Sequence, residues 1–282
     1  MKTKNELIDE LLDLAFAEDV GDGDHTTLST IPADAIGRSR LLVKEEGVIA
    51  GVEMAEKVLH RVDPSIKVEI IITDGSRVTP GDVAFFAEGP VRSLLVAERT
   101  LLNIMQRMSG IATMTRRYQD KLEGLKTKVL DTRKTTPGMR MLEKEAVRLG
   151  GGTNHRIGLF DMILIKDNHI DFAGGIEKAV ERAKNYCREN RKDLRIEVEV
   201  RGLDDIRRVL EIGGVDRIMF DNFTPELTRE AVALVGGKTE TESSGGITLD
   251  NLRAYGEAGV DFISVGALTH SVKGLDMSFK AV

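Results

Sequence analysis

The sequence contains a single cysteine, Cys187, which excludes an internal disulfide and a zinc site built from cysteine thiolates. It has only 6 prolines beside 28 glycines, a balance typical of tight turns in a folded chain rather than of disorder. Long apolar runs are also missing, and the opening segment interleaves acidic with apolar residues, unlike a signal peptide. We therefore expect a cytoplasmic protein with no membrane span.

The sequence also lacks an excess of positive charge. Its 46 acidic and 40 basic residues give a net charge of -6, which argues against a general nucleic-acid-binding protein. An anionic ligand would therefore have to be held by a local cluster of cations. The length of 282 residues is enough for one large barrel or for two modest domains.

The first part of the chain reads as a mixture of helices and strands. An opening helical segment, short strand-like runs and a helix near 53–61 indicate an α+β arrangement up to about residue 95. The loop GDGDHTT lacks the ligand spacing of a calcium-binding loop, so we interpret it as a structural turn. A long helical pattern over 93–123, with a candidate break at Ser109-Gly110, links this part to the next.

The second part alternates short apolar runs with amphipathic helices, which predicts parallel strands and a (β/α) barrel of eight strands or slightly fewer. A dinucleotide-binding sheet is the main competitor, but no G-x-G-x-x-G opens a helix. The expected strands are 128–130, 162–165, 196–200, 217–220, 238–242 and 262–265. The expected helices are 176–190, 203–212, 225–235 and 249–258.

Polar residues stand where each expected strand ends. In a (β/α) barrel the active groups lie just beyond the carboxyl ends of the strands, so these residues predict a ring of functional side chains. The ring comprises 131–134, 166–169, Glu199, 221–222, 242–246 and 266–267. The sequence therefore predicts an active site at that mouth.

Within the strand IEVEV, alternation places Glu197 and Glu199 on one face, which points into the barrel if the apolar face packs on helices. A structural ion pair and a functional role are equally good interpretations of Glu197, whereas Glu199 lies nearer the strand end and favours function. Together with Asp221, Glu199 supplies oxygen ligands that suit Mg²⁺, directly or through water. The five histidines show no HExxH or similar zinc-binding spacing.

Two small-residue turns, ESSGGIT and SVGALTHS, follow the last two expected strands, where barrels often bind phosphate. At the end of an earlier strand, Arg133 and Lys134 stand side by side. With Lys166 and the pair His155-Arg156, they predict a cradle for a polyanion. Arg99 and Arg107 fall on the long helix, where exposure on the helix surface is the default expectation.

These features together resemble the quinolinate phosphoribosyltransferase family, over nearly the whole chain. The resemblance is carried by ERTLLNIMQRMSGIAT, DTRKTTPGMR, GGGTNHRIGLFDMILIKDNHI, EVEV, DNF, ESSGGI and VDFISVGALTHS, in that order. It implies an N-terminal α/β sandwich over 1–108, completed by a C-terminal tail at 271–282, and an incomplete (β/α) barrel over 109–270. It also implies a glycosyltransferase that uses Mg²⁺ to convert quinolinate and phosphoribosyl pyrophosphate into nicotinate mononucleotide, pyrophosphate and CO₂ in NAD biosynthesis.

The resemblance further implies roles for individual residues and an assembly of dimers. The implied quinolinate pocket consists of Arg133, His155, Arg156 and Lys166, with Arg99 contributed by the partner subunit of a homodimer or larger assembly. Groups around the ribose, pyrophosphate and metal are Lys134, Glu199 and Asp221, and those at the phosphate end are Ser244, Gly245, Gly266 and His270. Two alternatives stay open at this point: a transferase for nicotinate, which has one carboxylate, and a barrel that binds a phosphorylated metabolite without turnover.

Overall fold

The computed structural model describes residues 2–282 and divides them into two compact units. Within this described part, unit 1 comprises residues up to Arg116 together with Thr135–Gly151 and Leu268–Val282. Unit 2 comprises Arg117–Lys134 and Gly152–Ala267. The domain boundary expected at residues 108 and 109 stays a prediction alongside this division. The fold is of the α/β class, with an antiparallel sheet in unit 1 and a parallel sheet in unit 2.

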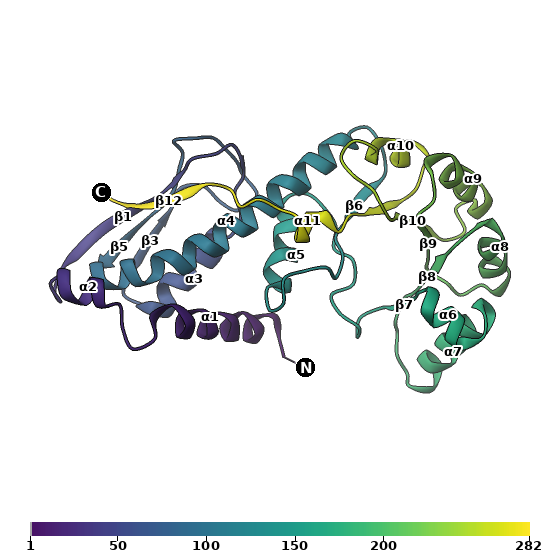
Figure 1. Cartoon of the computed structure of the whole chain (residues 1–282), viewed down its shortest axis with the longest axis horizontal. Helices are drawn as coiled ribbons and strands as arrows, with labels where there is room; N and C mark the ends of the chain where they lie inside the picture. The colour runs from purple at the N-terminus through teal and green to yellow at the C-terminus, as the bar shows by residue number, and fades with distance from the viewer. Residues whose placement is uncertain (1) are drawn as a thin grey trace. The chain divides into compact units, whose positions relative to one another are not determined.

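Unit 1 is built on a four-stranded sheet in the order β12-β1-β5-β3, whose paired strands are antiparallel. Its strands are β1 (Ile36–Val43), β3 (Lys67–Ile70), β5 (Val83–Pro90) and β12 (Met277–Ala281), with a separate two-stranded ribbon of β2 (Gly47–Val48) and β4 (Arg77–Val78). Its helices are α1 (Lys4–Val20), α2 (His25–Thr30), α3 (Val52–Val62), α4 (Val91–Lys121) up to Arg116, and α5 (Arg140–Leu149). Strand β12, near the C-terminus of the chain, pairs with β1, which lies in the N-terminal part of the sequence (Figure 1).

Local chemistry explains where the early elements of unit 1 begin. Thr3 and Glu6 form a capping box at the start of α1, in which each residue's side chain satisfies the other's backbone N–H. The loop GDGDHTT is a turn whose Asp24 caps α2 by accepting a hydrogen bond from the Thr27 N–H at 3.0 Å. In β1 the inward residues Leu41 and Val43 are fully buried, as the period of two in a one-sided sheet requires.

Helix α4 runs without interruption through Ser109-Gly110, so the expected break is wrong. The hydroxyl of Ser109 donates to the Ala50 carbonyl at 3.0 Å and accepts from the Ala50 N–H at 2.9 Å. A Cβ on Gly110 would lie 2.2 Å from the Lys273 carbonyl oxygen. Both residues are small because backbone segments of unit 1 approach the helix closely there. Close packing, not flexibility, therefore accounts for the sequence Ser109-Gly110.

Unit 2 is built on a six-stranded parallel sheet in the order β6-β11-β10-β9-β8-β7. Its strands are β6 (Lys128–Leu130), β7 (Ile163–Ile165), β8 (Ile196–Val200), β9 (Arg217–Asp221), β10 (Glu240–Ser244) and β11 (Phe262–Ser264). The first strand pairs with the last but not with β7 in this sheet, so the strands form an incomplete barrel, as expected.

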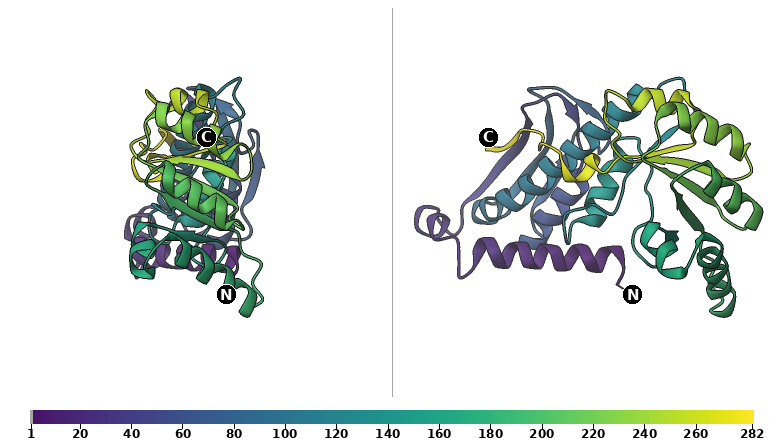
Figure 2. Two further views of the ribbon diagram at one scale, coloured as in Figure 1. Left: turned by 90° about the vertical axis from the view of Figure 1, so that its right-hand side faces the viewer. Right: turned by 45° about the vertical axis from the view of Figure 1, so that its right-hand side comes forward.

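Helices follow the strands of unit 2 and lie along the outer side of its sheet (Figures 1 and 2). They are α6 (Asp167–Ala173), α7 (Ile176–Glu189), α8 (Leu203–Ile212), α9 (Pro225–Val235) and α10 (Leu252–Glu257), with α11 (Ala267–His270) beginning after the last strand. The β8 strand is buried along its whole length, on both faces. Its two glutamates are therefore inside the unit.

The expected elements of unit 2 agree with the structure except at a few ends. Strand β10 begins at Glu240, two residues later than expected, because Gly236 and Gly237 take positive φ values and place Lys238 in the turn after α9. Cys187 lies on α7, as expected for a surface helix, and is partly exposed. No helix within residues 2–282 combines the length and the apolar character needed to cross a membrane.

Candidate active site

A cavity of about 340 Å³ opens in unit 2 where the strand ends converge. Ligand cavities in proteins are commonly of this size or larger, so it can hold a small ring compound or part of a larger ligand. Its lining comes from three segments and three strands. The segments are the one after β6, the one before β7 and the end of β7, and the strands are β9, β10 and β11. The lining residues are Thr132, Arg133, Lys134, His155, Arg156, Leu164, Lys166, Met219, Glu242, Ser244 and Ser264.

One wall of the cavity is cationic. Arg133, Lys134, Arg156 and Lys166 all line it, so the structure brings together the cations that the sequence predicted to form a cradle. Burial, and next the like charge of Arg133, lower the pKa of the Arg156 guanidinium. Glu197 and Asp161 partly offset this effect at Arg156, and an anion bound between the two guanidinium groups would offset it further. The wall therefore suits a ligand with more than one negative charge.

A buried carboxylate fixes the segment that carries His155 and Arg156. Asp131, at the end of β6 and fully buried, accepts hydrogen bonds from the Asn154 side chain at 2.6 Å and from the His155 N–H at 2.8 Å. A parallel bridge between Leu130 and Thr153 brings this segment against β6. Asp131 thus positions one side of the cavity, a role that its place at a strand end did not reveal.

An ion pair joins the ends of β7 and β8. The Nζ of Lys166 lies 3.2 Å from Glu199 Oε2, and Lys166 is about half exposed whereas Glu199 is nearly buried. Asp221 ends the neighbouring strand β9 and stands on the same face as Glu199, because Glu199 is level with Met219 in the β8–β9 register. The structure therefore places Lys166, Glu199 and Asp221 on adjacent strands, as the ring predicted.

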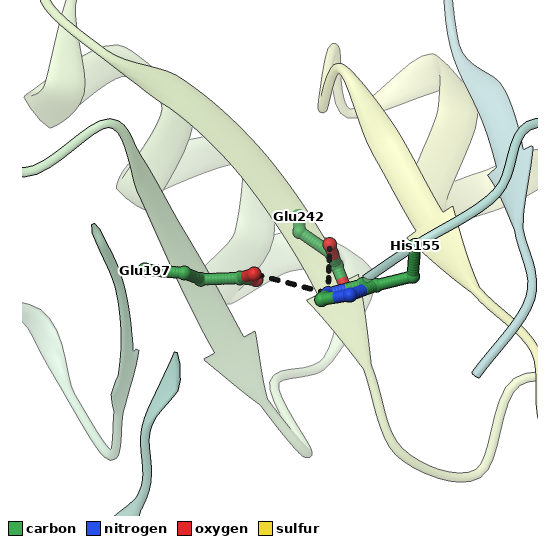
Figure 3. Close-up of side chains that lie close together, drawn as sticks. All are labelled: His155, Glu197 and Glu242. Carbon is green, nitrogen blue, oxygen red and sulfur yellow. Dashed lines mark ion pairs between the residues drawn. The ribbon is translucent and has the colours of Figure 1, made fainter. Parts of the chain in front are cut away.

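Three buried ionisable side chains meet inside unit 2: His155 from the segment before β7, Glu197 from β8 and Glu242 from β10 (Figure 3). His155 Nε2 is 3.0 Å from Glu197 Oε2 and 3.5 Å from Glu242 Oε2. Arg217 Nη1 is 2.9 Å from the same Glu242 oxygen, and Arg217 also contacts Glu240 through two nitrogens. Glu197 and Glu242 are fully buried. The structural interpretation of Glu197, as a partner in a buried ion-pair cluster, is the one that these contacts favour.

Burial is the main cause of the shifted pKa values of Glu197 and Glu242. Desolvation, opposed by Arg217, raises the pKa of Glu197 to about 7, and desolvation together with Glu197 raises the pKa of Glu242 to about 7. Within residues 2–282, His155, Glu197 and Glu242 are also the group of three that is close enough to ligate one metal ion. The Glu242 oxygen nearest His155 is already paired with Arg217, so we assign the group as an ion-pair cluster.

The turn after β10 has the tight backbone that the sequence predicted for a phosphate site. Gly245 has φ +97°, and a Cβ there would lie 2.1 Å from Asn222 Oδ1. The Asn222 N–H donates to the Ser244 carbonyl at 2.8 Å, which ties the ends of β9 and β10 together. Ser244 lines the cavity, and Gly266 follows β11 in the same unit. Only glycine fits at 245.

Three predicted residues lie in unit 1 and are described within it. Arg99 is exposed on α4 and lines a separate cavity of about 310 Å³ with residues of α1. His270 ends α11, is exposed, and its Nδ1 lies 2.6 Å from the Ser271 hydroxyl. Arg107 is not a plain surface residue, contrary to expectation, because its guanidinium forms a 2.9 Å ion pair with the fully buried Glu143. This ion pair joins α4 to α5. The hydrophobic periodicity of the two helices does not predict it.

Models of one protein family match both parts of the chain. The N-terminal domain model of quinolinate phosphoribosyl transferase matches residues 24–109, and the C-terminal domain model matches residues 111–280. The chain belongs to the quinolinate phosphoribosyltransferase family. Named relatives are similar to this chain over most of their length, and several solved structures over almost all of theirs.

A quinolinate phosphoribosyltransferase of Nicotiana glauca is 44% identical over 96% of this chain and 81% of its own. A probable nicotinate-nucleotide pyrophosphorylase of Bacillus subtilis is 43% identical over 95% of this chain and 91% of its own. The solved structure of the nicotinate-nucleotide pyrophosphorylase from Francisella tularensis is 40% identical, with a TM-score of 0.93 over 100% of this chain and 98% of that one. This family's activity is carboxylating nicotinate-nucleotide pyrophosphorylase, and the chain is a phosphoribosyltransferase of NAD biosynthesis that acts on quinolinate.

Proposed function

We propose that the cavity of unit 2 is where quinolinate reacts with phosphoribosyl pyrophosphate. The observation that carries this proposal is that Arg133, Arg156 and Lys166 line one cavity, where the charge of Arg133 acts on Arg156. Quinolinate carries two adjacent carboxylates, and arginine can grip a carboxylate through two parallel hydrogen bonds. A dianion relieves the repulsion between the guanidinium groups, whereas a neutral or singly charged ligand leaves part of it in place.

In this proposal Arg133, Arg156 and Lys166 neutralise the carboxylates, and the ring of His155 shapes the floor beside them. Holding the acid in place orients its ring nitrogen toward the anomeric carbon of the ribose. The nitrogen attacks that carbon as pyrophosphate leaves, and the ribose develops positive charge. Glu199 and Asp221, on adjacent strands, stabilise that charge through the ribose hydroxyls.

Glu199 and Asp221 are also the residues that would hold Mg²⁺, with Lys134 beside the pyrophosphate. Carboxylate oxygens at two adjacent strand ends fit a hard cation that takes its remaining ligands from water and from substrate phosphates. When bound, Mg²⁺ neutralises the charge that develops on the departing pyrophosphate. At the other end, the 5′-phosphate is held by Ser244, the turn at Gly245 and Gly266 of unit 2, where backbone N–H groups suit an anion. The role of His270, which lies in unit 1, stays a prediction of the family resemblance.

Once the ring nitrogen carries the ribose, it is cationic and stabilises an electron pair left on the adjacent ring carbon C2. The neighbouring carboxylate then leaves as CO₂, and the product is nicotinate mononucleotide. The position of the carboxylate next to the cationic nitrogen is what makes this loss easy. Nicotinate has no carboxylate at that position, so it would give no CO₂.

We further propose a homodimer, or a larger assembly of dimers, in which Arg99 of one subunit reaches the cavity of its partner. Arg99 is exposed, and unit 2 displays large apolar side chains that a second subunit would cover, namely Leu159, Phe160 and Phe172. Mixing an Arg99→Ala variant with a Lys166→Ala variant tests this arrangement. Hybrid dimers contain one site with both residues intact, so activity returns on mixing if Arg99 acts across subunits, and does not return if it acts within its own.

A cytoplasmic location stays a prediction of the sequence. The plant relatives named as mitochondrial or chloroplastic are longer than this chain, which covers 81% of the proteins from Nicotiana glauca and Arabidopsis thaliana. Fractionation of the source cells followed by immunodetection decides the compartment.

The experiment that tests the reaction supplies quinolinate, phosphoribosyl pyrophosphate and Mg²⁺ and follows CO₂ and nicotinate mononucleotide together. Equal amounts of both products are expected from quinolinate, and little or none from nicotinate. Chelation of Mg²⁺ should stop turnover and its return should restore it. Turnover of nicotinate alone would indicate a transferase for the single-carboxylate acid, and tight binding without turnover would indicate a regulatory protein.

A further inference from the structure

Glu242 stands out among the buried groups because the proposed binding roles do not use it. It lies on β10, is fully buried and yet lines the wall of the cavity, in the same lining as Arg156 and Lys166. Buried carboxylates are costly unless they are paired, protonated or used. The two oxygens of Glu242 have different surroundings, and this difference indicates which explanation applies.

One oxygen of Glu242 is held and the other is available. Oε2 accepts a hydrogen bond from Arg217 Nη1 at 2.9 Å and lies 3.5 Å from His155 Nε2. Oε1 has no hydrogen-bond partner among residues 2–282, although it is buried. A buried oxygen without a partner in a native protein calls for an explanation. A proton on Oε1, in a residue that lines the cavity, provides one.

The charges of the cluster leave a proton to be placed. His155 Nδ1 accepts a hydrogen bond from the Arg156 N–H at 2.7 Å, so a ring proton is on Nε2, which faces Glu197 at 3.0 Å. Arg217 is the guanidinium in direct contact with Glu242, and Glu240 also shares it, while Arg156 and Arg195 act on Glu197 from farther away. Both carboxyls are fully buried, and desolvation outweighs these cations, which favours a bound proton on the pair. Because Arg217 holds Oε2, the proton on Glu242 resides on Oε1.

The proposed reaction requires a proton at ring carbon C2 of the ligand. When the C2–carboxylate bond of the ribosylated ring breaks, CO₂ departs and the electron pair stays on ring carbon C2. That carbon must receive a proton before nicotinate mononucleotide can leave. Protonation by a positioned side chain requires a donor in contact with the ligand whose pKa lies near the working pH.

We propose that the protonated carboxyl of Glu242 is the catalytic acid that supplies this proton to C2. The O–H bond at Oε1 breaks, the C2–H bond forms, and Glu242 is left ionised beside Arg217. It regains a proton from water after product release. Glu197, Arg217 and His155 are positioning residues, since they set the charge and orientation of Glu242 without touching the ring. This inference rests on the proposed function and adds a residue to its second chemical step.

Burial, reinforced by Glu197, raises the pKa of Glu242 to about 7, with Arg217, His155 and Ser264 acting in the opposite direction. These are the charged and hydrogen-bonding groups that face Glu242 from β8, β9, β11 and the segment before β7. The carboxyl is therefore protonated below about neutral pH and loses its proton as the pH rises. Turnover limited by protonation of C2 should fall with rising pH for the same reason.

The test compares Glu242→Gln with the matched control Glu240→Gln on the same strand. Glutamine keeps the shape of a protonated carboxyl but has no proton to give, whereas Glu240 is more exposed and contacts Arg217 without lining the cavity. At pH 6, Glu242→Gln should lower kcat about 100-fold or more, the usual range for loss of a general acid. The quinolinate Kd, measured by calorimetry, should stay within about threefold, since binding does not need the proton.

Three readouts separate a proton donor from a structural residue. Wild type and Glu240→Gln should lose activity on the alkaline side, and Glu242→Gln should have a low rate that changes little over the same range. Quenched reactions of Glu242→Gln should contain ribosylated quinolinate that has kept both carboxylates, detected by mass. Glu242→Asp, which keeps an acid but shortens its reach, should recover part of the rate.

The proposal is overturned if Glu242→Gln keeps the wild-type pH profile, or if it merely melts earlier with kcat unchanged, because the proton would then come from elsewhere. If Glu242→Gln does not fold, the profile of Glu242→Asp decides, and an unchanged rate and profile there also overturns it. Failure of the wild type to release CO₂ from quinolinate would reject the proposed function itself, which is a different result from these.

Discussion

Lys166 and Glu199 form a 3.2 Å ion pair across the ends of β7 and β8, and the two side chains differ sharply in burial. The Glu199 side chain is 8% exposed and that of Lys166 is 48% exposed. A nearly buried carboxylate thus depends on a lysine that can also reach a ligand in the cavity. If quinolinate binds as proposed, Lys166 has two anionic partners, and the pair would couple acid binding to the ribose side of the site.

This coupling predicts a non-additive effect on turnover. Lys166→Met and Glu199→Gln should each lower kcat/KM about 100-fold, as is usual when one electrostatic group is removed from an active site. The double variant should lose much less than the product of the two effects, because either change already disrupts the pair. Steady-state kinetics with quinolinate checks this, with the exposed Lys178→Met as control. Strict multiplication of the two losses would mean that the pair does not act as a unit.

The cationic wall predicts a loss of quinolinate binding when either arginine is shortened. Arg133→Ala and Arg156→Ala should raise the KM for quinolinate about 100-fold, since truncating one partner of a desolvated charge pair costs about 3 kcal/mol. Melting temperatures should change little, because removing one guanidinium also removes its repulsion with the other. The exposed Arg188→Ala on α7 serves as control. Normal quinolinate kinetics in both variants would reject this assignment of the pocket.

The buried Glu242 predicts a specific dependence of stability on pH. Its pKa is raised from 4.5 to about 7, so between these values the folded protein holds a proton that the unfolded chain has released. Raising the pH through this window therefore costs wild-type stability, by about 1.4 kcal/mol for each unit of pKa difference. In Glu242→Gln this loss should be smaller, and the part that remains comes from Glu197, whose pKa burial also raises to about 7. Urea unfolding at pH 5 and pH 8 measures it, and equal pH dependence in both proteins would contradict the assignment.

The geometry of Gly245 predicts that a larger residue there causes both backbone strain and a steric clash. Gly245→Ala would place Cβ against Asn222 and hold a left-handed φ, whereas Gly237→Ala has a positive φ of 73° with open space around it. The control should lose about 1 kcal/mol of stability from backbone strain alone. Gly245→Ala should lose at least about 2 kcal/mol and show a higher KM for phosphoribosyl pyrophosphate. Equal losses in the two variants would show that Asn222 simply moves aside.

The strand ends of unit 2 were predictable because parallel strands impose a simple rule. Active groups of a barrel gather at one mouth, so the order of the apolar runs predicts that Arg133, Lys166, Glu199 and Asp221 lie near one another. The break expected at Ser109-Gly110 was wrong for a related reason. Small residues within a helical pattern predict a helix break. Here they are small because a distant segment, at Lys273, packs closely against the helix, and the local pattern does not contain that information.

The sequence by itself determined the alternation of strands and helices, the cationic and acidic character of the mouth, and the family. These depend on periodicity and on motifs, which are properties of neighbouring residues. Only the tertiary structure decided that Asp131 holds the His155 segment, that Arg107 pairs with Glu143, and that Glu242 has one held and one available oxygen. Such pairings join residues far apart in the chain, and the free energy of a buried charge depends on partners that only folding brings within reach.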